Sequence, residues 1–126
     1  GVLSNGFPNL FMVAGPQSVS GSTNFPRAIE GGVDWVTGLL QHARSNGSTR
    51  VEAEADAEEE WVGEVVKAHE RMLFRRSKGW FTGYNSNVAG HQEGKIRYQA
   101  YFGGAPKYNA MANQVVADGY RGVEIS

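Results

Sequence analysis

The stretch that decides the fold reads GFPNLFMVAGP at residues 6–16 and continues as QSVSGSTNF at residues 17–25. Turn-forming residues lead into the apolar run 10–14, which ends at Gly15-Pro16 before a loop of small residues. A continuous apolar run of this length favours a strand buried on both faces, as in a parallel sheet. Because α/β proteins bind ligands where such a strand ends and a helix begins, the sequence predicts a ligand-facing loop here.

The helix that follows this loop is predicted over about residues 25–45. Asn24 can cap it, Pro26 fits its first turn, and Asn46-Gly47 are residues common at helix ends. Apolar residues recur at steps of three and four, which predicts one buried stripe. The stripe consists of Ile29, Val33, Val36, Leu40 and Ala43, flanked by Trp35 and Leu39.

Two further helices are expected. One covers about residues 57–75 and is opened by Asp56 with Glu59, a spacing typical of a capping pair. The other starts at Pro106 and ends near Gly119. Helical spacing of apolar residues inside both segments supports this interpretation.

The remaining segments predict short strands and one long loop. Strands are expected at 10–14, 96–102 and 120–125, whereas 50–55 is interpreted as a polar connector rather than a strand. The Gly-, Asn- and Ser-rich segment 77–95 is typical of a functional lid or a linker. The chain by itself is therefore expected to be α+β, with about three helices and two or three short strands.

Composition excludes several classes of function. A net charge of −1 gives no electrostatic footprint for nucleic acid, and no apolar run is long enough to span a membrane. Zero cysteines exclude disulfides and thiolate metal sites and fit a cytoplasmic protein. His42, His69 and His91 lack metal-ligand spacing, so no metal is expected, and His69 is interpreted as a half-buried core residue.

Four blocks of sequence resemble one enzyme family over nearly the whole chain. They are residues 6–11, then Ala14-Gly15-Pro16 with Ser18 and Ser20, then Ile29-Glu30 with Asp34-Trp35-Val36, and finally Trp80-Phe81-Thr82-Gly83, supported by Gly103-Gly104 and by Gly119-Tyr120 with Gly122. In this order the blocks resemble the C-terminal part of type I Baeyer–Villiger monooxygenases. Within that family the chain is most similar to the phenylacetone, steroid and large-ring cycloketone group.

The resemblance implies an α/β parent enzyme with Rossmann-like domains that bind FAD and NADP. Such enzymes use NADPH and O2 to convert ketones to esters or lactones. Residues 1–46 would be the last strand, flavin-facing loop and helix of the FAD domain. Residues 47–126 would be a C-terminal helix, a lid loop and a terminal strand–helix–strand segment.

The resemblance also implies roles for single residues. Gly15, Pro16, Asn24, Phe25 and Trp80 would contact the cofactors, with Trp80 closing over the nicotinamide. Ser20, Gly21 and Ser22 would border the ketone together with Phe25. No catalytic residue is expected within the chain. The residues alone favour a plain strand-to-helix turn for the loop and an aromatic plug under a long loop for Trp80, and the resemblance reverses both interpretations.

The sequence contains no Gly-x-Gly-x-x-Gly turn, so we expect a C-terminal fragment that binds no cofactor by itself and lacks its N-terminal domains. The unpaired strand at 10–14 could instead pair with another copy of the chain. Segment 85–94 is longer than the usual loop of the family, which leaves the substrate preference open. Two alternatives remain: a related flavin monooxygenase that oxygenates nitrogen or sulfur, and a stand-alone binding or assembly domain.

Overall fold

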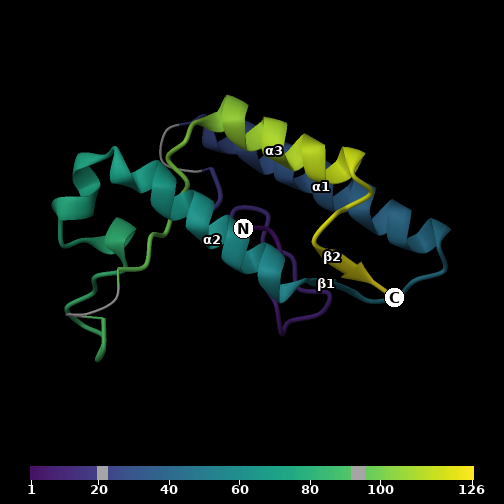
Figure 1. The fold of residues 1–126 in the computed structure, drawn as a ribbon, viewed down its shortest axis with the longest axis horizontal. Helices are drawn as coiled ribbons and strands as arrows, with labels where there is room; N and C mark the ends of the chain where they lie inside the picture. The colour runs from purple at the N-terminus through teal and green to yellow at the C-terminus, as the bar shows by residue number, and fades with distance from the viewer. Residues whose placement is uncertain (20–22, 92–95) are drawn as a thin grey trace.

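The computed structural model describes residues 1–19, 23–91 and 96–126 as three α-helices, two short 3-10 helices and a two-stranded sheet (Figure 1). Helices α1 and α3 lie side by side, and α2 runs along the other side of the N-terminal segment. The elements in chain order are α1 (Phe25–Ser45), β1 (Val51–Ala53), α2 (Ala55–Glu70), η1 (Leu73–Arg76), η2 (Trp80–Thr82), α3 (Ala105–Ala117) and β2 (Val123–Ile125). The α+β prediction is confirmed.

Helix α1 forms as its caps predict. Asn24 is the N-cap, and its side-chain oxygen accepts a hydrogen bond from the Arg27 amide at 3.1 Å. The helix ends at Asn46, whose amide bonds back to the carbonyls of Ala43 and Arg44.

The predicted apolar stripe of α1 is only partly buried. Leu39 and Ala43 are buried in the main core, whereas Val33 is 46% exposed and Leu40 is 42% exposed. The apolar arc of α1 is wider than one neighbour can cover, because Trp35 and Leu39 extend it to one side of the stripe. Within the described part of the chain, that side of α1 is the one that packs against the core. The core beneath it comprises Leu39, Ala43, Val51 and Tyr120, packed against Leu3, Phe11, Trp35, Val115, Val123 and Ile125.

The sheet lies where the sequence analysis expected a connector. β1 pairs antiparallel with β2, with Val51 opposite Ile125 and Ala53 opposite Val123. Residues 50–55 were interpreted as a polar connector, and this is wrong. The strand forms because the distant segment 123–125 supplies its partner and because Asn9 brackets Val51 by two hydrogen bonds, of 2.8 and 3.0 Å.

Segment 10–14 is not a strand in this structure, contrary to the prediction. Its backbone bonds are local or reach the N-terminal segment, such as the one from the Met12 amide to the Val2 carbonyl at 2.8 Å. Among the described residues β1 and β2 form the only sheet, so this run has no strand beside it. It packs instead against α1, where a side chain at Gly32 would lie 2.7 Å from the Val13 carbonyl.

The second helix begins and ends earlier than predicted. Its N-cap is Glu54, which makes no side-chain capping bond, so the predicted pair of Asp56 and Glu59 does not open the helix. Glu58 in the first turn instead accepts a hydrogen bond from the Asn5 amide at 2.5 Å. A carboxylate at this position also suits the positive end of the helix dipole. Among the described residues no helix has the length and apolar character to cross a bilayer.

Candidate functional site

The first part of the candidate site is the loop that precedes α1. Gln17 adopts φ +64°, a left-handed conformation uncommon for a residue other than glycine. Its amide donates to the Gln99 carbonyl at 2.8 Å, and the Ser18 carbonyl accepts from the Tyr101 amide at 3.1 Å. Ser18 and Val19 are buried, at 5% exposure each, so tertiary contacts hold the loop in place.

The start of α1 has the electrostatics expected of a site for an anionic group. Its first turn contains no acidic residue and carries Arg27. The positive end of the helix dipole adds to this charge. The amide of Arg27 is taken by Asn24, and Pro26 has no N–H. The terminus therefore offers positive charge and the helix dipole more than a set of open amide donors.

The second part of the site is the turn that presents Trp80. Trp80 is 65% exposed and contacts the neighbouring Phe81 ring edge-on, with centroids 5.3 Å apart. The turn beneath it is held by the buried Thr82 hydroxyl, which accepts a hydrogen bond from the Gly79 amide at 3.3 Å and lies within 3.0 Å of the carbonyl oxygens of Ser77 and Gly79. Gly83 ends the turn at φ +76°. The structure therefore presents the Trp80 ring to solvent, and the plug interpretation does not describe it.

Segment 97–101 joins the two parts of the site. On one edge, the amides of Arg97 and Gln99 donate to the carbonyls of Thr82 and Phe81, both at 3.1 Å. On its other edge lie the two bonds to Gln17 and Ser18 given above. The N–H of Gln99 thus bonds to Phe81 on one side, and its C=O bonds to Gln17 on the other. In a β-ladder, a hydrogen-bonded residue directs both groups to the same neighbouring strand. This explains why the strand predicted at 96–102 does not form.

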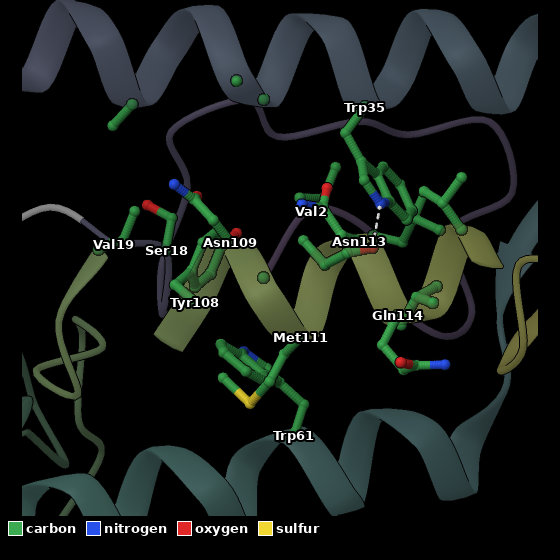
Figure 2. A pocket seen from close by; sticks show the side chains of 18 of the residues that line it. Val2, Ser18, Val19, Trp35, Trp61, Tyr108, Asn109, Met111, Asn113 and Gln114 are labelled. Atoms are coloured by element: carbon green, nitrogen blue, oxygen red, sulfur yellow. Dashed lines mark hydrogen bonds between the residues drawn. The ribbon is translucent and has the colours of Figure 1, made fainter. Parts of the chain in front are cut away.

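A cavity of about 1080 Å³ lies between α1, α2, α3 and the N-terminal segment. Figure 2 shows the side chains of Trp61 from α2 and Met111 from α3 together in the space between these two helices, with Ser18 and Tyr108 toward one end. The indole N–H of Trp35 donates to the Ala112 carbonyl at 3.3 Å and ties α1 to α3 along its wall. Burial raises the pKa of the Tyr108 phenol above its usual range.

The cavity and the predicted cofactor residues overlap only in part. Phe25 lines the cavity, whereas Gly15, Pro16, Asn24 and Trp80 do not. The predicted ketone-bordering residues Ser20, Gly21 and Ser22 lie outside the described residues.

The three histidines serve separate local contacts. His42 Nε2 lies 3.3 Å from the side-chain nitrogen of Asn46, and the His42 ring contacts Tyr120. His91 Nε2 accepts a hydrogen bond from the Arg97 guanidinium at 3.2 Å. His69 is fully buried rather than half-buried, stacked on Tyr98 with centroids 3.8 Å apart. Sequence reasoning missed this stack, because the two residues are far apart in the chain. Within residues 1–19, 23–91 and 96–126, no cluster of three potential ligands could hold a metal ion.

Comparison with known sequences shows which proteins the chain is similar to. No family model matches the chain. The chain is 33% identical over 126 residues to a cyclopentanone 1,2-monooxygenase of Comamonas sp. (strain NCIMB 9872), covering 100% of this chain and 22% of that protein. It is 34% identical over 122 residues to a phenazine N-monooxygenase of Lysobacter antibioticus, covering 97% of this chain and 21% of that one.

Solved structures give the same relationship. The crystal structure of cyclohexanone monooxygenase from Rhodococcus sp. Phi1 bound to NADP+ matches with a TM-score of 0.82 at 34% identity, over 99% of this chain and 22% of that one. A complex of the enzyme OTEMO with FAD and NADP matches with a TM-score of 0.77 at 28% identity, over 100% and 22%. The chain spans about one fifth of the length of these relatives. Over that length the chain is similar in sequence and in fold to type I Baeyer–Villiger monooxygenases, and solved structures of these relatives include complexes with FAD and NADP.

Proposed function

We propose that the chain is the C-terminal segment of an FAD- and NADPH-dependent Baeyer–Villiger monooxygenase that converts a ketone to an ester or lactone with O2. The observation that carries the proposal is the match along the full 126 residues to a cyclopentanone 1,2-monooxygenase, joined to the TM-score of 0.82 with a cyclohexanone monooxygenase. We call the proposed complete enzyme the parent enzyme.

The residue roles follow from the two parts of the site. Gly15, Pro16, Asn24 and Phe25 would face the flavin, which supplies the oxygen-transferring chemistry when bound. A reduced flavin ring is anionic, and the α1 terminus fits it because Arg27 and the helix dipole place positive potential there. The proposed ketone-bordering residues are Phe25 with Ser20, Gly21 and Ser22.

Trp80 would contact the nicotinamide cofactor. Its exposed ring and indole N–H fit a planar partner that carries hydrogen-bond acceptors. The turn from residue 79 to 83 fixes its backbone, so little ordering would be needed when the cofactor binds.

The rest of the parent enzyme would cover the surfaces that the chain leaves open. These surfaces are the exposed side of α1, with Val33 and Leu40, and the unpaired run 10–14, which packs against α1 at Gly32. In a sheet provided by the missing domains, that run would gain the strand neighbours it lacks here. Neither loop of the site forms a complete flavin site, so the chain alone is expected to be inactive. Pairing with a second copy is the competing way to cover these surfaces.

A second candidate function is oxygenation of nitrogen. The match to the phenazine N-monooxygenase favours it, because that relative is as similar to the chain as the ketone monooxygenases are.

Product analysis of the complete protein encoded by the reading frame that contains these residues separates the two functions. Purified protein is incubated with NADPH and O2, and with cyclic ketones or phenazines in turn. The proposal predicts NADPH consumption that depends on the ketone and a lactone that has gained one oxygen. An N-oxide without any lactone would replace it by the second candidate, and turnover of neither class would exclude both.

A further inference from the structure

The bridge segment 97–101 links two loops that are distant in the sequence. Four backbone hydrogen bonds, of 2.8 to 3.1 Å, connect it to Gln17 and Ser18 on one edge and to Phe81 and Thr82 on the other. Gln99 takes part on both edges at once. A displacement of either loop must therefore strain or break bonds at the bridge.

Helix α2 contacts the bridge through the ring of His69. His69 is fully buried, its ring lies parallel to Tyr98 within 15°, and it meets the Phe102 ring edge-on at a centroid distance of 5.0 Å. Its Nδ1 lies 3.0 Å from the Val65 carbonyl one helical turn earlier and donates to it. That bond fixes the ring plane and places a proton on Nδ1.

The chemistry of His69 does not suggest a catalytic role. Its Nε2 is buried and finds no hydrogen-bond partner among the described residues, and the ring lies against aromatic side chains. An aromatic ring tethered to a helix and stacked on a loop residue positions that residue. The aligned rings lie directly beside the four bridge bonds, since Tyr98 is part of the bridge.

We infer that His69 is a positioning residue that clamps the bridge 97–101 and thereby makes the Trp80 turn and the Gly15–Val19 loop move as one unit. The meaning of this coupling rests on the proposed function: the nicotinamide-facing and flavin-facing loops would be set together. The coupling itself is a property of this chain and can be tested without any cofactor.

The test is amide hydrogen exchange, measured by NMR on the 126-residue chain. His69→Leu removes the stacked ring, and we expect the amides of Gln17, Arg97, Gln99 and Tyr101 to exchange faster together, by about tenfold or more. His69→Phe keeps a stacked ring and is expected to restore most of the protection. The control His42→Leu removes a histidine that contacts Tyr120, not the bridge, and should leave these four amides unchanged.

A second pair of variants approaches the bridge from its other end. A methyl group at Gly83 would lie 2.8 Å from the Arg97 Cβ at φ +76°, whereas one at Gly90, at φ +79°, would meet nothing within 4 Å. Gly83→Ala should speed exchange of Gln17 and Tyr101 on the far edge, and Gly90→Ala should not. The amide of Leu39, a fully buried residue in the middle of α1, reports global unfolding. If His69→Leu unfolds the chain, the comparison of Gly83→Ala with Gly90→Ala still tests the coupling.

Faster exchange on only one edge of the bridge, in both His69→Leu and Gly83→Ala, would overturn the inference. In the complete flavoprotein, His69→Leu should weaken NADP+ binding and perturb the flavin absorption spectrum together. A complete protein without flavin would refute the proposed function and leave the exchange result standing.

Discussion

Gly32 shows how one residue fixes the position of the apolar run 10–14. The backbone carbonyl of Val13 approaches α1 so closely that a methyl group at Gly32 would lie 2.7 Å from it. The neighbouring Gly31 faces open space, with nothing within 4 Å of an added methyl group. Two adjacent helical glycines therefore have opposite environments.

The effect of alanine at these two positions should have opposite sign. Gly32→Ala should lower the free energy of unfolding by about 1–3 kcal/mol, because the backbone of Val13 must move. Gly31→Ala should raise it by about 0.5–1 kcal/mol, because alanine loses less entropy on entering a helix. Urea unfolding of both variants measures the difference. Equal effects would show that the run does not pack on α1 as described.

A substitution at the exposed residue Trp80 is expected to change cofactor binding without changing the stability of the chain. It is 65% exposed, so Trp80→Ala should leave the urea midpoint of the chain almost unchanged. In the parent enzyme the same change should weaken NADP+ binding by about tenfold, through loss of a ring contact and one hydrogen bond. Trp80→Phe, which loses only the indole N–H, should lie in between. Unchanged titrations of the alanine variant with NADP+ would remove Trp80 from the cofactor site.

At the scale of elements, α1 has one covered and one open apolar side. Leu39 is fully buried, and the next residue, Leu40, is 42% exposed. The described residues thus bury one side of the apolar surface of α1. We propose that the rest of the parent enzyme covers the other side.

Alanine substitutions of these two leucines measure how much each side of α1 contributes to the free energy of unfolding. Leu39→Ala should destabilise the isolated chain by about 2–5 kcal/mol, because it leaves a cavity in the main core. Leu40→Ala should cost about 1 kcal/mol or less, because its side chain already contacts water. Thermal or urea unfolding compares them under the same conditions. A large effect of Leu40→Ala would mean that a second copy already covers this side in solution.

The elements also show what the sequence could predict. Helix α1 was predictable because its signals are local: the Asn24 cap, Pro26 in the first turn, and residues 46–47 at its end. Strand β1 was not predictable, since its partner strand lies about 70 residues away. Its other edge is held by hydrogen bonds between Val51 and Asn9, which are also distant in the sequence. The bridge 97–101 was mistaken for a strand because its aromatic alternation is that of a strand, while its bonds serve opposite neighbours.

The candidate site was predictable only through family resemblance. A Gly-Pro turn before a capped helix indicates a ligand-facing loop in general, but nothing local names a flavin. The stack of His69 on Tyr98 and the four bridge bonds depend on tertiary contacts between segments that no motif connects. The resemblance supplied Trp80, and the structure adds that its ring is exposed on a turn closed by hydrogen bonds between Thr82 and Gly79.

For the whole molecule, the central claim is that these residues complete a flavin site that they cannot form alone. The chain spans 22% of the length of the cyclopentanone 1,2-monooxygenase that it resembles. We propose that a larger protein covers the exposed side of α1 and the unpaired run 10–14.

The most direct test is the flavin content of two purified proteins, the 126-residue chain and the complete product of its reading frame, read from the visible absorption spectrum. The account predicts that the complete protein carries about one FAD per chain and that the 126-residue chain is colourless. A short chain that binds FAD and oxidises NADPH by itself, or a complete protein without flavin, would contradict it.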